Sequence, residues 1–333
     1  MKKTIFKMWA LVAMCVCSLN ASAQYATDFQ VTEVEDYETS VNIDTSVSGL
    51  LTAFNYAQAN GTAPDLSSLT IAEDVKTKIG KLWADCPFRC METELVERAV
   101  LTPRKEFQIR NIPLVMAPVE GVSKDISWKK YQEGVITISD KGIITDFHLA
   151  IDTDLYISVM NSAKSVEDFE HRQLILEYVE RFRNAYNLKD LDFMQQIFSE
   201  DALIITGKVV KAVKSDINRM SLSNNKIVYS QQTKKQYLAN LARVFKANKR
   251  INVQFDDIKV VHHPAKKGFY GVTLKQGWQS DGYSDEGYLF LLWDFTNEDA
   301  PQIHVRTWQP DKIDVNTPLP EDEIFSIDDF DLE

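Results

Sequence analysis

Residues 165–310 show a helical hydrophobic pattern that gives way to strand-like alternation. Apolar residues recur every three or four positions from Leu174 to Ala185, which predicts an amphipathic helix. Ser165 followed by Asp168 has the spacing of a capping box, whose side chains satisfy the free amide groups at a helix start. The segment therefore predicts a cone-shaped α+β domain of helices packed on a curved antiparallel sheet. Helices are expected at 165–187, from 190 and at 235–247, and strands near 203–207, 251–261, 269–279, 287–295 and 302–308.

The preceding part of the chain predicts a second, smaller α+β domain. Residues 24–48 are rich in Thr, Ser, Asp and Glu, and we expect an extended or loosely ordered arm there. Over 49–164, two amphipathic helices precede several strands. Asp140-Lys141-Gly142 separates two apolar runs and predicts a hairpin whose glycine takes a positive φ. A helix around 155–160 is expected to close this domain.

Where the first helix of the larger domain ends, the sequence resembles a known superfamily. Tyr186-Asn187-Leu188-Lys189-Asp190-Leu191-Asp192, followed by Phe198 and Asp201-Ala202, is similar to the opening of the nuclear transport factor 2-like superfamily. That superfamily includes ketosteroid isomerase-like and polyketide cyclase-like proteins with a cystatin-like cone. The resemblance implies such a cone around a pocket over 165–310. It implies no chemistry, because members range from isomerases to accessory domains and no catalytic pair aligns here.

The strand at 288–295 is apolar on both faces. Leu289, Leu291 and Trp293 point to one side, while Phe290 and Leu292 point to the other. A strand with two apolar faces is normally covered on both. We therefore expect the outer face of the sheet to pack against the other domain or a partner, either a second copy of the chain or another protein.

Pairing the last two strands by their apolar residues predicts a polar cluster. If Trp293 lies opposite Val305, then Asp294 lies opposite His304. In a pocket, Asp294 would orient the His304 imidazole and raise its pKa; a hydrogen-bonded core or interface pair is the alternative. A small apolar molecule is the ligand expected for such a pocket. The candidate pocket-lining residues are Tyr178, Tyr229, Gln276, Trp278, Tyr288, Asp294, His304, Arg306 and Trp308.

No motif in the sequence indicates a cofactor or a metal ion. There is no Gly-rich phosphate loop, Gly-x-Ser-x-Gly elbow, His-Glu-x-x-His helix or EF-hand loop. The adjacent His262 and His263 lie at a predicted turn, which favours a solvated hairpin tip over metal binding. We therefore expect neither a cofactor nor a metal site, and no catalytic residue is identified.

The first 23 residues have the pattern of a secretory signal peptide. Lys2, Lys3 and Lys7 precede an apolar stretch at 8–16, and Ala21-Ser22-Ala23 predicts cleavage between Ala23 and Gln24. The alternatives are an uncleaved anchor, for which the apolar stretch is short, and a lipoprotein signal. No later segment approaches membrane-spanning length. The sequence therefore predicts an exported protein, soluble in the periplasm or outside the cell.

The charge of the chain argues against anionic partners. Loss of the three signal-peptide lysines changes the net charge from −11 to −14, and this surface disfavours nucleic acid, whose phosphates bind basic patches. Residues 311–333, the tail, are acidic, with interleaved residues such as Phe325 and Phe330. The tail is expected to be solvated and frayed, or else to dock on its own domain or a partner.

Cys86 and Cys90 are the only cysteines after the signal segment. Export permits a disulfide between them, and two buried thiols are the alternative. Three residues separate them, whereas a thioredoxin-like redox centre has two, and no further ligands indicate a metal site.

Together these features favour a binding protein over an enzyme. The leading hypothesis is an exported bacterial protein whose cone is a non-catalytic binding or assembly module. The alternative is a small-molecule-binding protein or isomerase/cyclase-type enzyme, which requires a deep cavity holding a carboxylate or histidine with a displaced pKa.

Overall fold

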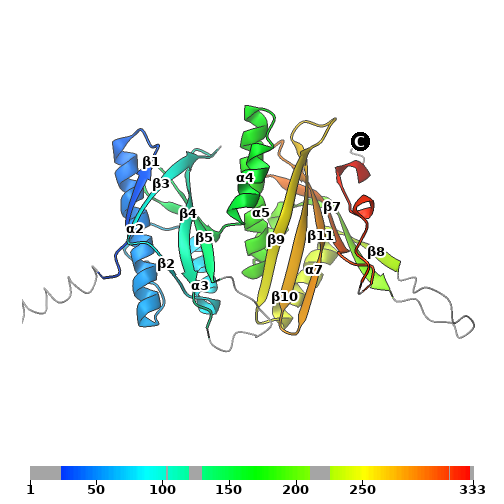
Figure 1. The fold of residues 1–333 in the computed structure, drawn as a ribbon, viewed down its shortest axis with the longest axis horizontal. Coiled ribbons are helices and arrows are strands. Elements are labelled where there is room, and N and C mark those ends of the chain that lie inside the picture. The colour runs from blue at the N-terminus through cyan, green and yellow to red at the C-terminus, as the bar shows by residue number, and fades with distance from the viewer. Residues whose placement is uncertain (1–23, 103, 120–129, 211–225, 315, 331–333) are drawn as a thin grey trace, which may run out of the picture. The chain divides into compact units, whose positions relative to one another are not determined.

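The computed structural model describes residues 24–102, 104–119, 130–210, 226–314 and 316–330. The described chain divides into two compact units, one ending at Ala150 and the other beginning at Ile151 (Figure 1). The sequence pattern predicts a boundary at residue 165, but the helix α4 (Thr153–Asn161) groups with the second unit rather than the first. The predicted signal peptide lies outside the described residues. Among the residues described, no helix is long and apolar enough to cross a membrane.

The first unit is a six-stranded sheet with two helices. The strand order is β1-β3-β4-β5-β6, with β2 paired to β4. The β1–β3 pair is parallel and the other pairs are antiparallel. Gly142 has a φ of 74° in the β5–β6 turn, which confirms the predicted hairpin. The elements are β1 (Asp28–Thr32), α2 (Tyr37–Asn60), α3 (Glu73–Asp85), β2 (Phe88–Cys90), β3 (Glu94–Leu101), β4 (Phe107–Met116), β5 (Tyr131–Ile138) and β6 (Ile144–Leu149).

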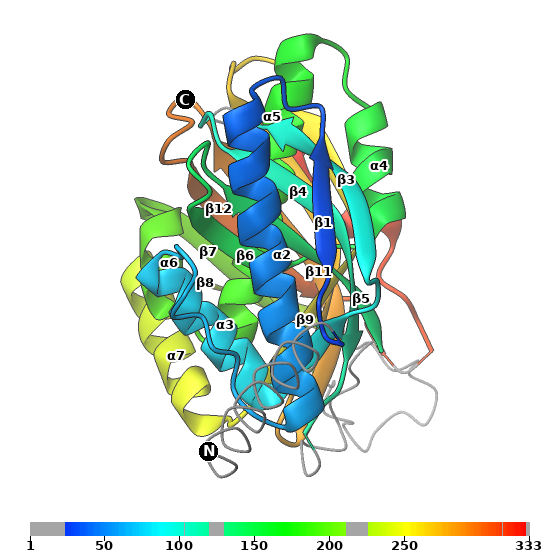
Figure 2. The ribbon, with the colours of Figure 1, turned by 90° about the vertical axis from the view of Figure 1, so that its left-hand side faces the viewer.

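The predicted extended arm is wrong from residue 37 onwards, because α2 begins at Tyr37. The Asp36 side chain accepts a hydrogen bond of 2.7 Å from the backbone amide of Thr39 and caps the helix. Ile43 and Val47 are fully buried and extend the apolar stripe seen further along the helix. Before α2, β1 pairs with β3, and α2 packs beside β1 (Figure 2). The polar composition of this segment suggested an arm, but the Asp36 cap and the apolar face with Ile43 and Val47 are sufficient to define a helix.

The second unit has the predicted α+β class, with four helices and one six-stranded mixed sheet in its described part. The strand order is β8-β7-β12-β11-β10-β9, and only the β7–β12 pair is parallel. The strand β8 is not among the elements predicted from the sequence. The elements after α4 are α5 (Val166–Asn187), α6 (Leu191–Ile197), β7 (Phe198–Val210), β8 (Lys226–Gln232), α7 (Lys234–Ala247), β9 (Ile251–His262), β10 (Phe269–Ser280), β11 (Tyr283–Asp294) and β12 (Gln302–Pro310).

Side-chain caps fix where the helices of this unit begin. Ser165 Oγ accepts a hydrogen bond of 3.1 Å from the amide of Asp168 and starts α5. Asp190 caps α6 through the amide of Phe193. Thr233 and Gln236 form a complete capping box at the start of α7. These caps satisfy amide groups that have no partner within the helix.

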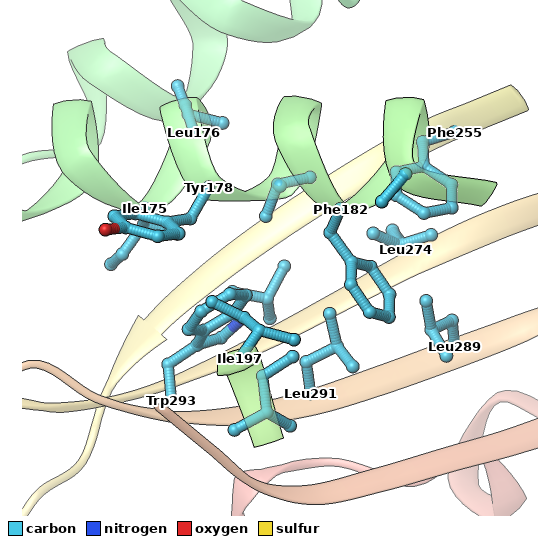
Figure 3. Close-up of a cluster of buried hydrophobic side chains, with 14 of the residues drawn as sticks. Ile175, Leu176, Tyr178, Phe182, Ile197, Phe255, Leu274, Leu289, Leu291 and Trp293 are labelled. Atoms are coloured by element: carbon cyan, nitrogen blue, oxygen red, sulfur yellow. The ribbon is translucent and has the colours of Figure 1, made fainter. Parts of the chain in front are cut away.

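The core of this unit lies between α5 and the inner face of the sheet. Figure 3 shows Phe182 of α5 above Leu289, Leu291 and Trp293 of β11. All four side chains are fully buried. Burying a large apolar side chain contributes about 1.5–3 kcal/mol, so this layer stabilises the packing of α5 on the sheet.

Part of the outer face of the sheet, around Phe290 and Leu292, is covered by the tail. Phe290 and Leu292 of β11 form a second apolar cluster with Ile327, which is 7% exposed. The ring of Phe290 stacks on Phe330 with 5.3 Å between centroids and 6° between planes. Gly271 lies beneath Ile327, where an added Cβ would come within 3.0 Å of the Ile327 Cβ. Of the two expectations for the tail, docking on its own domain is therefore realised at Ile327 and Phe330. The expectation that the other domain or a partner covers this face stays a prediction.

The two cysteines are free, buried thiols, so the disulfide alternative is not realised. Cys86 follows the last residue of α3, and Cys90 lies four residues later at the end of β2. Extended residues advance about 3.3 Å each, which separates these positions beyond the roughly 7 Å between Cα atoms that a disulfide can span. Burial raises the pKa of the Cys86 thiol to about 12 and also raises that of Cys90.

Candidate functional site

A cavity of about 870 Å³ lies between α7 and the inner face of the sheet in the second unit. Its wall is formed by Tyr186 at the end of α5, by one face of α7, and by residues of β7, β10, β11 and β12. Val244 and Glu286 belong to this wall and are exposed, so the cavity opens to solvent. Its volume is within the range of small-molecule sites, roughly 300–1,000 Å³.

Arg306 places a positive charge in the cavity wall. The alternation of β12 points Arg306 and Trp308 to the inner face, whereas Gln309 points outward to the tail. Arg306 is 6% exposed, and its guanidinium carbon lies 5.0 Å from the centre of the Tyr237 ring. Within the described part of the chain, Arg306 forms no ion pair with a carboxylate. Burial opposes the charge, but the phenols of Tyr186 and Tyr237 and the Asp285 carboxylate outweigh burial and raise the Arg306 pKa.

Two tyrosine hydroxyls meet beside this guanidinium. The oxygens of Tyr186 and Tyr237 are 2.6 Å apart, and both residues are buried. Burial holds the pKa of Tyr237 well above its usual value, so the phenol is neutral at physiological pH. The hydrogen bond between the two hydroxyls joins the end of α5 to α7. The pair presents a polar, uncharged group to the cavity.

Three buried polar atoms of the cavity wall have no hydrogen-bond partner among the described residues. They are Arg306 Nε and Trp308 Nε1, which are donors, and Gln276 Oε1, which is an acceptor. A buried polar group without a partner costs about 1–3 kcal/mol. All three residues line the cavity, so these are the buried groups for which a bound molecule would supply partners.

The part of the wall formed by β11 is acidic. Tyr283 donates a hydrogen bond of 2.7 Å to Asp285 Oδ2. Burial raises the pKa of the Asp285 carboxyl, and it raises the pKa of the Tyr283 phenol to about 12. Glu286 forms an ion pair of 3.2 Å with Lys275. Asp285 and Glu286 are thus already bound by neighbouring side chains, Asp285 through a hydrogen bond and Glu286 through an ion pair.

Four of the nine residues proposed from sequence line the cavity: Gln276, Trp278, Arg306 and Trp308. Tyr178 belongs to the core instead, where its ring packs 5.8 Å from that of Trp293. Tyr229 is on β8 and accepts a hydrogen bond from Gln309 beside the tail. Tyr288 is paired with Gln309 on the outer face, because it precedes the inward-facing Leu289.

Asp294 and His304 approach each other, but they do not line this cavity. His304 Nε2 lies 3.4 Å from Asp294 Oδ2, and the His304 ring lies beside Phe269. The expected register is wrong, because a bulge pairs Trp293 with Ile303 and Leu292 with Val305. The bulge leaves His304 unpaired and separates this pair from Arg306.

Four further residues of the cavity wall, Tyr186, Tyr237, Tyr283 and Asp285, are not evident from the sequence. Tyr186 and Tyr237 continue the apolar stripes of their helices, a signal that core residues give equally well. Asp285 lies between the strands predicted at 269–279 and 287–295, but belongs to β11 in the structure. In the described residues, no group of three potential metal ligands comes together.

Comparisons with known proteins concern the fold alone. No family model matches the chain, and no curated protein matches it. An NTF2-like protein from Cytophaga hutchinsonii is similar over 42% of this chain and 97% of its own, with 11% identity and a TM-score of 0.30. Kfla4162 from Kribbella flavida is similar over 48% and 93%, with 10% identity and a TM-score of 0.29. Bd1075 from Bdellovibrio bacteriovorus is similar over 51% and 56%, with 16% identity and a TM-score of 0.32.

Proposed function

We propose that the second unit is a nuclear transport factor 2-like binding module that holds a small organic molecule in its cavity. The observation that carries this proposal is the set of three partnerless buried atoms, on Arg306, Trp308 and Gln276, in one solvent-open cavity. Aromatic walls with a few converging polar groups are typical of small-molecule sites. In this proposal the protein is exported, as the sequence of residues 1–23 indicates.

The test is to identify what the protein carries when purified from its own cells. The protein is purified under native conditions, its intact complex is weighed by native mass spectrometry, and the released small molecules are identified after denaturation. We expect one small molecule per chain. The sequence of the amino terminus in the same sample tests export, because cleavage leaves Gln24 first.

A matched pair of substitutions on α7 locates the molecule. Val244→Trp puts a large ring at the wall of the cavity, whereas Lys246→Trp puts the same ring on an exposed position outside it. We expect Val244→Trp to lose the bound molecule and Lys246→Trp to retain it. Retention by both variants, with unchanged occupancy, contradicts the proposed site.

One observation favours a second candidate function, a proton-transfer enzyme of the isomerase type. Asp285, whose pKa burial raises, lines the same cavity as the hydroxyl pair of Tyr186 and Tyr237. A carboxylate base and a hydroxyl that donates to a developing oxyanion are the groups such a reaction needs. The test is exchange of ligand C–H for deuterium in D₂O. Asp285→Asn should abolish exchange without preventing binding, and a ligand that never exchanges rejects this candidate.

A further inference from the structure

We infer that the ligand of the cavity is an organic monoacid, with a carboxylate that pairs with Arg306 and a hydrogen-bond donor at its far end that reaches Gln276. This inference rests on the proposed function and specifies its ligand. It is drawn from the chemistry of the partnerless atoms and from their places in the sheet.

The positive end of the site is Arg306. A buried charge with no ion-pair partner in direct contact is unfavourable. Arg306 nevertheless presents a partnerless Nε in the cavity wall, beneath the ring of Tyr237. The Asp285 carboxylate acts on Arg306 without forming an ion pair with it. A ligand carboxylate supplies a direct ion-pair partner with two acceptor oxygens, which suit the planar guanidinium. Trp308, two residues along the same strand face, supplies a further donor.

The other end of the site, at Gln276, accepts a hydrogen bond. Gln276 is 4% exposed, and its Oε1 has no partner in the described residues. A hydroxyl or amine of the ligand satisfies it, whereas a second carboxylate places acceptor against acceptor. Asp285 and Asp311 also line the cavity, and their charge further disfavours a dianion.

The register of the sheet sets the separation between these two ends. Gln276 of β10 pairs with Gly287 of β11, which pairs with Pro310 of β12. Arg306 lies four residues before Pro310 on β12. Gln276 is therefore two strands away from Arg306 and displaced from it by four residues along the strand direction. Strand geometry puts their Cα atoms roughly 16 Å apart. The two side chains shorten this gap without closing it. The carboxylate and the donor must therefore be joined by an apolar body, which Trp278 and Leu241 of the cavity wall can contact.

The test uses three matched naphthalene probes and isothermal titration calorimetry on the chain from Gln24 to Glu333. The probes are 6-hydroxy-2-naphthoate, its neutral amide, and naphthalene-2,6-dicarboxylate, which lacks the donor. We expect the hydroxy acid to bind at least about tenfold more tightly than the amide, the advantage of a charge-assisted hydrogen bond. The dicarboxylate should bind more weakly than the hydroxy acid.

Two variants assign each end of the ligand. Arg306→Gln should weaken binding of the hydroxy acid by about tenfold or more and leave the amide within about twofold. Gln276→Leu should weaken binding of the hydroxy acid and bring its affinity closer to that of the dicarboxylate. The control is Arg243→Gln, which replaces an exposed arginine of α7 outside the cavity. It should change the affinity of neither the hydroxy acid nor the amide. The melting temperature of each variant without ligand shows whether it folds. If Arg306→Gln does not fold, the affinities of the three probes and of Gln276→Leu still test the proposed ligand class.

The outcomes separate this inference from the proposed function. An amide that binds as tightly as the acid, or an Arg306→Gln variant with full acid affinity, overturns the acid class and leaves the cavity as a binding site. If no probe binds, the molecule released from the native protein decides: a monoacid with a distant donor supports the inference, and a neutral molecule overturns it. If no probe binds and nothing is released, both are overturned.

Discussion

Gln309 on β12 holds the tail by both ends of its side-chain amide, and Phe325 is its central partner. Gln309 Oε1 accepts a hydrogen bond of 2.8 Å from the Phe325 amide, while Nε2 donates to the carbonyl of Glu323 and to the hydroxyl of Tyr229. Gln309 is 1% exposed. This outward-facing residue therefore fixes the tail on the sheet, while its neighbours Arg306 and Trp308 face the cavity on the other side.

Replacing Gln309 by methionine should loosen the tail. Gln309→Met keeps the side-chain length but removes three hydrogen bonds, leaving the Phe325 amide and the Glu323 carbonyl without their partner. We expect a loss of about 2 kcal/mol in the free energy of unfolding, measured by urea denaturation. Gln302→Met, at an exposed position of the same strand, is the control and should change stability by less than about 0.5 kcal/mol. Equal stability of the two variants would reject this role for Gln309.

Ile327 should be the apolar anchor of the tail. Ile327→Ala removes most of a buried side chain that packs over Gly271 and beside Phe290 and Leu292. We expect the tail to open more often and to be cleaved several-fold faster by a protease of low specificity, because large-to-small substitutions at buried sites cost about 2–5 kcal/mol. Asp328→Ala, at the exposed neighbouring position, should be cleaved like the unmodified chain. Identical cleavage of all three proteins contradicts tail docking through Ile327.

The buried thiol of Cys86 should make the protein less stable at alkaline pH. Its pKa is about 12 in the folded chain against 9.0 for a solvated thiol, so the unfolded state loses the proton first. The contribution of Cys86 is complete below pH 9 and is lost as the pH rises towards 12, by at most about 1.4 kcal/mol per pH unit. The raised pKa values of the buried Tyr237 and of the more exposed Tyr283 act in the same direction.

Unfolding free energies between pH 8 and 11 test this effect. The Cys86→Ala variant should show a smaller decline with pH than the unmodified chain, whatever its stability at pH 8. The tyrosine contributions are common to both proteins, so the difference between the two slopes reports Cys86 alone. Parallel slopes would mean that Cys86 keeps an ordinary pKa in the fold.

The sequence predicts the helices and strands of the second unit well, because local signals define them. The capped apolar stripe of α5 and the alternation in β11 are both realised in the structure. The start of α2 is not predicted, because Thr, Ser and Asp dominate its first turns and obscure the apolar positions at Ile43 and Val47.

The candidate site depends on geometry that the sequence does not encode locally. One bulge between β11 and β12 changes which residues face each other, so the sequence pattern groups Asp294 and His304 wrongly with Arg306. Tyr186 and Tyr237 look like core residues in their helices, and only the three-dimensional arrangement brings their hydroxyls to 2.6 Å beside a buried arginine. Long-range placement also brings the tail over Phe290, a contact that no local pattern in the sequence specifies.

The most direct test of the proposed binding site is where a ligand binds, and tryptophan indole signals report this. In the chain labelled with ¹⁵N-tryptophan, Trp278 and Trp308 line the cavity, whereas Trp83 lies in the first unit and Trp293 in the core. Each indole N–H signal is assigned by Trp→Phe substitution, and the protein is titrated with the molecule released from its native form or with 6-hydroxy-2-naphthoate. We expect the signals of Trp278 and Trp308 to shift while those of Trp83 and Trp293 stay in place. Binding that leaves both Trp278 and Trp308 unshifted would contradict the proposed site.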